Sequence, residues 1–142
     1  MSIVVQIEHR SNLDDYAEIA HLAQAVGELR GEAQGLVPLL EGRTVWMVNS
    51  TSRGGGVAEM LPTLIHLLRE LGVSVEWAVL DTDHQGFFPL TKRIHNLIHG
   101  EGDPHLTRAD RELYDAVSRE NAERLRPLVR REDILVVHDP QP

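Results

Sequence analysis

Cysteine is absent from the 142-residue chain. That absence excludes disulfide bonds, thiolate metal sites and a cysteine nucleophile, and it fits a reducing compartment. No apolar run approaches the ~20 residues that a membrane-spanning helix needs. The first residues, MSIVVQIEHR, carry too many charges and too short an apolar stretch for a secretory signal. We therefore expect a cytoplasmic protein with no membrane partner.

The signatures of several nucleotide- and metal-dependent classes are also missing. The chain has no GxGxxG fingerprint and no GK[ST] sequence, which argues against a dinucleotide enzyme, an ATPase or a nucleotide switch. His84, His95, His99 and His105 follow neither HExxH nor a zinc-module spacing, so we expect no metal and no cofactor. A net charge of -8 disfavours nucleic acid as a partner.

Length and composition predict one folded domain over residues 1–142. Hydrophobic residues make up 42% of the chain, which is not a disordered composition. A domain of this size buries roughly 68–70% of its unfolded surface. Residues 1–41 predict a short strand at 3–7 followed by a helix, and residues 42–142 predict alternating strands and helices.

Three apolar runs, 44–48, 73–80 and 134–137, predict buried strands. A glycine-rich stretch follows the first run, and an apolar stripe at helical spacing follows the glycines until Gly72. The order strand, loop, helix and strand is a βαβ unit, which requires a parallel sheet with a right-handed crossover. We predict an α/β fold with a Rossmann-like parallel sheet and flanking helices.

Some positions interrupt the helical patterns. Gly31 and Gly35 break an apolar pattern at helical spacing in the N-terminal region, and we expect them to end that helix. Pro62 falls early in the helix after the glycines and predicts a loose first turn. The segment 81–91 predicts a loop because it combines Gly, Pro and polar residues, and a short helix is expected at 92–99.

The last predicted helix begins at a capping box. Thr107 with Asp110 has the spacing in which each side chain bonds the other's backbone N–H. The apolar stripe that follows reaches Leu125 or Leu128. Asn121 falls on that stripe and interrupts it.

Two strand ends carry the candidate chemistry. The sequence NSTSRGGG (residues 49–56) follows the first strand, and HDPQ (residues 138–141) follows the last. Since ligands of open parallel sheets bind beyond the carboxyl ends of the strands, we expect both segments at one edge. Glycines 54–56 would let an anion or a sugar oxygen approach the backbone closely, and the alternative is a tight turn without a ligand.

His138 and Asp139 suit recognition of sugar hydroxyls. The carboxylate would accept hydrogen bonds, and the imidazole would donate one or act as an acid or base. The alternative is that Asp139 only starts a turn before Pro140. Arg53 would meet a phosphate or be solvated, and the polar cluster at 92–96 would form a pocket wall or an exposed helix face.

Four segments resemble one enzyme family, in the family's order. They are VNSTSRGGGVAEMLPTLIHLLRELGV, TKRIHNLIHG, RELYDAVSRENAERL and VVHDPQP. Over about residues 42–142 the chain is similar to the trehalose synthases that join nucleotide-linked glucose to free glucose. These are retaining GT-B glycosyltransferases, in which two Rossmann-like domains face each other across a cleft. The resemblance implies that this N-terminal domain shapes the acceptor side and that no metal is required.

The same resemblance implies roles for particular residues. Gly54, Gly55 and Gly56 would approach the donor phosphate or the transferring sugar, and His138 and Asp139 would bind sugar hydroxyls. The other implied cleft residues are Asn49, Ser50, Arg53, Glu59, His95 and Asn96. Expected partners are glucose or trehalose, with nucleotide-glucose as a donor substrate where the C-terminal domain is present. ADP-, UDP- and GDP-glucose all stay open, as does the direction of the reaction.

The family's nucleotide-holding domain has no counterpart in residues 1–142. We therefore expect this chain to be a truncated N-terminal domain that is inactive or nearly so by itself, because the leaving diphosphate needs preorganised groups around it. The alternative is a non-catalytic module that binds sugar or dimerises. A half-sheet that ends at ILVV leaves an uncovered edge, which predicts a homodimer.

Overall fold

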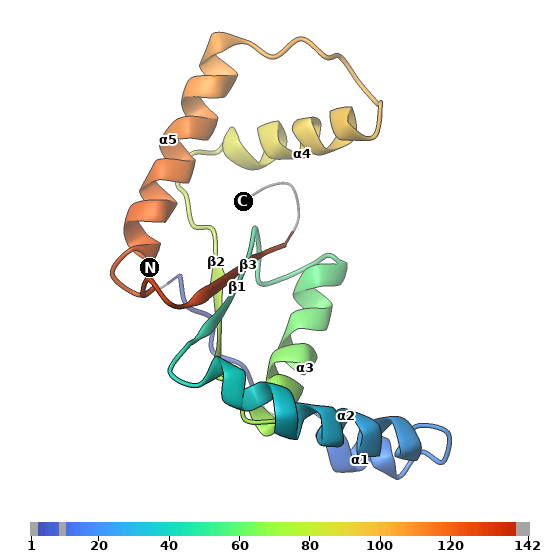
Figure 1. Cartoon of the computed structure of the whole chain (residues 1–142). Coiled ribbons are helices and arrows are strands. Elements are labelled where there is room, and N and C mark those ends of the chain that lie inside the picture. The colour runs from blue at the N-terminus through green and yellow to red at the C-terminus, as the bar shows by residue number, and fades with distance from the viewer. Residues whose placement is uncertain (1–2, 9–10, 139–142) are drawn as a thin grey trace.

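The computed structural model describes residues 3–8 and 11–138. Its elements, in chain order, are α1 (Leu13–Ala17), α2 (Ala23–Leu36), the 3-10 helix η1 (Val37–Leu40), β1 (Val45–Asn49), α3 (Gly56–Glu70), β2 (Val75–Val79), α4 (Phe87–Ile98), α5 (Arg108–Leu125) and β3 (Ile134–Val137). Helix α4 lies beyond the carboxyl ends of the strands, and α1 and α2 lie at the opposite end (Figure 1). In the described ranges, no helix has the length and apolar character needed to cross a membrane.

The predicted parallel sheet is confirmed. It has three strands in the order β2-β1-β3, and both neighbours run parallel to β1. All residues of β1 are buried because one face packs on α3 and the other on the end of α5 and the segment after it. The first face contributes Val45 and Met47, and the second contributes Trp46 and Val48. This burial on both faces explains the unbroken apolar run.

Helix α3 ends where the sequence predicts. Gly72 has a φ of 95°, and the Val73 N–H donates to the Leu68 carbonyl over 3.0 Å, as in a Schellman cap. The prediction of a loose first turn is wrong, since α3 begins at Gly56 and Pro62 lies inside it. Proline removes one helical hydrogen bond, and the deep burial of this helix against the sheet compensates for that loss.

The N-terminal region departs from prediction in three ways. The single helix expected after the first strand is wrong, because α1 ends at Ala17 and α2 begins at Ala23. The prediction that Gly31 and Gly35 end a helix is wrong. Helix α2 continues through both glycines to Leu36, and the residues around them favour helix. The expected strand at 3–7 forms only an isolated antiparallel bridge between Val4 and Ala78.

The expected loop over 81–91 is also wrong in its second half. Helix α4 begins at Phe87, whose side chain is buried and stacks on Tyr114 at a centroid distance of 6.0 Å. Pro89 lies in the first helical turn, where its missing N–H has no intrahelical partner to lose. Burial of one aromatic ring therefore extends the helix into a segment whose composition predicts a loop.

Asn121 has a structural reason to interrupt the apolar stripe of α5. Its side chain is buried, accepts from the Asp81 N–H over 2.9 Å, and donates to the Asp81 carbonyl over 3.1 Å. Arg124 adds an ion pair to the Asp81 carboxylate at 3.0 Å. Helix α5, which starts at the predicted capping box of Thr107 and Asp110, is thereby fastened to the end of β2.

Asp133 fastens the other end of the sheet. Its side chain is 1% exposed and accepts from the Arg130 guanidinium over 2.9 Å. The backbone N–H groups of Arg130 and Thr44 donate to the same carboxylate over 2.8 and 2.9 Å. These hydrogen bonds hold the pKa of Asp133 well below its usual range, and the bond from the Arg130 side chain has the largest effect.

We predict that Asp133→Asn lowers the melting temperature at neutral pH, because an amide cannot accept from all these donors. A depressed folded-state pKa gives stability that is present above about pH 4 and is lost as the pH falls through that pKa. Circular-dichroism melts in acid should therefore show the gap to wild type closing. Asp115→Asn, which removes a more exposed partner of Arg111 at 3.6 Å, is the control. A gap that stays constant with pH would contradict this account.

Among the described residues, β3 has a neighbouring strand on one side only. The prediction of a buried strand at 134–137 is wrong, because this edge strand has one covered face only and Leu135 and Val137 are 49% and 50% exposed. We expect a second copy to pair along this edge, so the chain should sediment as a concentration-dependent dimer. Leu135→Lys should give a monomer, whereas Leu39→Lys, at an exposed position on η1, should not. A monomer across the whole concentration range for the wild type would reject the idea.

Candidate functional site

A cavity of about 390 Å³ lies between the β1–α3 loop (residues 50–55) and α4, at the carboxyl edge of the sheet. Its lining residues are Asn49, Ser50, Thr51, Gly54, Gly55, Gly56, Val57, Ala58 and His95. Six of these nine were expected from sequence. Thr51, Val57 and Ala58 were not, because nothing in their side-chain chemistry distinguishes them.

The glycine triplet, Gly54–Gly56, forms one wall. Gly54 and Gly55 have φ values of 73° and 86°, a region that side-chain-bearing residues rarely adopt. Gly55 is the N-cap of α3 and has no side chain to accept from the first-turn N–H groups. Those groups lack partners within any α-helix, so they suit an anion or a sugar oxygen. A Cβ added at any of the three would meet no atom within 4 Å, which shows that this wall is open.

Asn49 and Ser50 lie where β1 becomes the loop, and both are buried. The Asn49 side-chain oxygen accepts from the Trp77 indole N–H over 2.7 Å, and its nitrogen donates to the Thr51 carbonyl over 2.6 Å. Both ends of the amide are therefore used within the protein.

His95 faces the triplet from α4. Its Nδ1 is buried and has no hydrogen-bond partner among the described residues. Its ring packs edge-on against His99 at a centroid distance of 4.7 Å. Leaving a buried nitrogen without a hydrogen bond costs roughly 1–3 kcal/mol of folding free energy. A hydrogen bond from a water or a ligand hydroxyl to this nitrogen would therefore be favourable.

The expected meeting of the two strand ends is confirmed for His138. Its N–H donates to the Val48 carbonyl over 2.8 Å, and its Nε2 lies 3.3 Å from the Met47 sulfur. Met47 belongs to the face covered by α3, so the imidazole lies on the same side of the sheet as the triplet. Asp139 lies outside the described residues.

His138 and three other expected residues do not line the cavity. Arg53 and Glu59 are exposed, the first in the loop and the second in the first turn of α3. Asn96 is half-buried on α4, and its carbonyl accepts from the Glu101 N–H over 2.9 Å. The site formed by described side chains is therefore narrower than the one expected from sequence.

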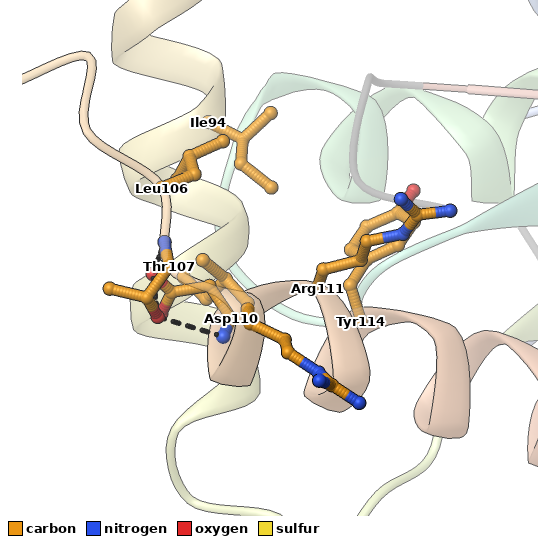
Figure 2. A pocket seen from close by; sticks show the side chains of 8 residues that line it. Ile94, Leu106, Thr107, Asp110, Arg111 and Tyr114 are labelled. Atoms are coloured by element: carbon orange, nitrogen blue, oxygen red, sulfur yellow. Dashed lines mark hydrogen bonds between the residues drawn. The ribbon is translucent and has the colours of Figure 1, made fainter.

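A second cavity of about 500 Å³ lies between α4 and α5 (Figure 2). Leu90, Ile94, Leu106 and Tyr114 supply much of its wall. Thr107 and Asp110 also line it, but they bond each other in the α5 cap. It contains none of the expected residues. The smaller cavity is the better candidate, since it combines open backbone with an imidazole whose Nδ1 has no partner among the described residues.

No group of three or more His, Asp or Glu side chains is placed to hold a metal ion within residues 3–8 and 11–138. His84 lies 3.6 Å from Glu120, which is a single ion pair.

Residues 47–142 match the family of the trehalose synthase N-terminal domain. The chain belongs to this family. A trehalose synthase of Rubrobacter xylanophilus is 46% identical over 115 residues, which cover 81% of this chain and 27% of that protein. A trehalose synthase of Pyrococcus horikoshii is 38% identical over 133 residues, covering 94% and 30%. A trehalose phosphorylase of Pleurotus pulmonarius is 40% identical over 70 residues, covering 48% and 9%.

The chain thus spans between 27% and 30% of the length of the two trehalose synthases. The matched family region starts inside β1 and includes the β1–α3 loop, α4 and β3. It therefore contains every residue that lines the candidate cavity.

The backbone conformation of Gly55 leads to a prediction about the stability of this trehalose synthase domain. At φ 86° and ψ 153° this residue occupies a region open essentially to glycine alone. Gly55→Ala should lower the free energy of unfolding by about 1–3 kcal/mol even though the new methyl group meets no atom. Urea denaturation measures this change. An unchanged midpoint would mean that the loop relaxes to another conformation without cost.

Proposed function

We propose that this domain is the acceptor-side part of a retaining GT-B glycosyltransferase that forms trehalose. The enzyme would break the bond between C1 of glucose and the diphosphate of a nucleotide-glucose, and form a bond from C1 to a hydroxyl of a second glucose. The nucleotide diphosphate would leave, and its phosphate oxygen would take up the proton that the acceptor hydroxyl gives up. The donor is a substrate and not a cofactor. Membership of the trehalose synthase family supports this proposal.

The observation that carries the proposal is the open glycine triplet facing His95 across one cavity. Negative charge develops on the leaving diphosphate, and unpaired N–H groups at a helix N-terminus stabilise such charge. Glu59 lies in the same first turn and would oppose an anion, but its side chain is exposed and solvent screens it. The triplet would therefore face the donor phosphate or the transferring glucose.

The acceptor side of the proposal rests on the polar groups around the same edge. His95 Nδ1 has no protein partner among the described residues, so a sugar hydroxyl would satisfy it. His138, and with it the neighbouring Asp139, would contact hydroxyls of the acceptor. Arg53 and Asn96 would join the site only if the loop or α4 moves toward a bound donor.

A second candidate reaction comes from the similarity to trehalose phosphorylases. In that case the donor would be a sugar phosphate, and the direction could run toward breakdown of trehalose. The same triplet would bind the phosphate in either reaction. A third possibility is that the domain binds sugar without catalysing transfer.

We predict that this chain binds a phosphate-bearing donor or glucose weakly but saturably. Isothermal titration with glucose, trehalose, UDP-glucose, ADP-glucose and glucose 1-phosphate tests this. Gly56→Ala should weaken binding of the phosphate-bearing ligands by about tenfold, because a methyl group would project into their cradle. Gly56 has no positive φ and open space at its Cβ position, so the fold should tolerate the change.

Gly31→Ala is the matched control. It is also a helical glycine with open space around it, and it lies in α2, at the other end of the domain (Figure 1). It should leave every binding constant unchanged and stabilise the fold by about 0.5–1 kcal/mol. Binding of glucose 1-phosphate but not of nucleotide sugars would favour the phosphorylase-like reaction. Equal phosphate-ligand affinity for Gly56→Ala and wild type would refute close approach to the triplet.

A further inference from the structure

One continuous chain of hydrogen bonds joins the sheet to the glycine triplet. The Trp77 indole N–H donates to Asn49 over 2.7 Å, and Asn49 donates to the Thr51 carbonyl over 2.6 Å. The Thr51 hydroxyl donates to the Arg53 carbonyl over 2.8 Å and accepts from the Arg53 N–H over 3.1 Å. Gly54 is the next residue, so the chain of bonds ends where the triplet begins.

The direction of each bond follows from the chemistry of its partners. An indole N–H can only donate, so the oxygen of the Asn49 amide must face Trp77. The nitrogen of the amide then faces the Thr51 carbonyl, which can only accept. Asn49 is 0% exposed, and both ends of its amide are committed. One N–H and one lone pair of the amide stay unused, but the side chain is fully buried, so a ligand in the cavity does not reach it in this conformation.

The loop that these bonds hold would otherwise be costly to order. Glycines have more conformational freedom than any other residue, and fixing each backbone unit costs about 1–2 kcal/mol. A site that binds through ordered backbone N–H groups gains affinity when this ordering is complete before the ligand arrives. Trp77 is 2% exposed and lies in the core beside α3, so it is a rigid anchor for the chain of bonds.

We propose that Asn49 and Trp77 are positioning residues that hold the β1–α3 loop in its ligand-binding conformation without touching the ligand. This inference rests on the proposed function, because it takes the triplet to be the ligand contact. It assigns Asn49 a role different from the direct cleft contact that the family resemblance implies.

The decisive measurement is the backbone order of the triplet in the free chain. We expect backbone NMR order parameters of about 0.85 at Gly54, Gly55 and Gly56 in the wild type and below about 0.6 in Asn49→Leu. Asn49→Leu has similar volume and removes both amide bonds. The control is Ile65→Val, a fully buried position on α3 outside this hydrogen-bond chain, which should lower stability but leave the triplet ordered.

Thr51→Val decides the matter if Asn49→Leu does not fold. Thr51 is only half-buried, and this change removes just the link to Arg53. Loss of order in the triplet with either variant, and not with Ile65→Val, supports the inference. Unchanged order in the folded variants overturns it, whether or not any ligand binds.

Titration of the same proteins with glucose 1-phosphate separates this inference from the proposed function. If the wild type binds, Asn49→Leu should bind about tenfold more weakly and Ile65→Val should match wild type. If the wild type binds none of the sugars or sugar phosphates, the proposed function fails. In that event the order parameters still decide whether Asn49 and Trp77 hold the loop, so failure of the proposed function and failure of the positioning role give different results.

Discussion

The parallel pairing of β1 with strands on both sides is the constraint on which the rest of the structure depends. Every residue of β1 is buried, so the strand can neither slip in register nor move to an edge without exposing apolar surface. Because all three strands run the same way, Asn49 and His138 emerge at one edge. Helix α3 begins at that edge with Gly56, the last residue of the glycine triplet, which places its first-turn N–H groups there.

A buried polar side chain secures each end of β1, and the two differ in charge. Asp133, at the amino end, is an ionised carboxylate that gathers donors from Arg130 and the start of β1. Asn49, at the carboxyl end, is a neutral amide that gathers a core indole and a loop carbonyl. The hydrogen bonds of the Asp133 carboxylate make the stability of the domain sensitive to acid. The Asn49 amide adds no charge to the cavity, so the helix N-terminus and the nearby polar side chains set its electrostatic potential.

The candidate site combines two kinds of unsatisfied group. The first turn of α3 offers backbone N–H donors, and His95 offers a buried nitrogen without a partner among the described residues. The His95 nitrogen would be unfavourable in a structure selected for stability alone, because buried polar groups are normally paired, whereas the exposed triplet leaves its N–H groups open to water or a ligand. Their meeting across one cavity, within the region matched by the trehalose synthase family, is why we place ligand binding there and not in the larger apolar cavity beside α5.

Local chemistry in the sequence by itself determined much of the fold. Apolar runs specified the three strands, Gly72 specified the end of α3, and the Thr107–Asp110 pair specified the start of α5. The glycine triplet also predicted a loop with unusual backbone angles, and Gly54 and Gly55 have positive φ values that glycine adopts far more readily than other residues.

Tertiary structure decided the features that depend on partners distant in the chain. Burial of Phe87 turned an expected loop into helix, and packing against the sheet kept α3 regular through Pro62. The roles of Asn49 and Asn121 could not be read locally, because their partners Trp77 and Asp81 become neighbours only when the sheet and α5 assemble. A polar residue in an apolar pattern indicates that a partner exists, but only the folded chain determines which one.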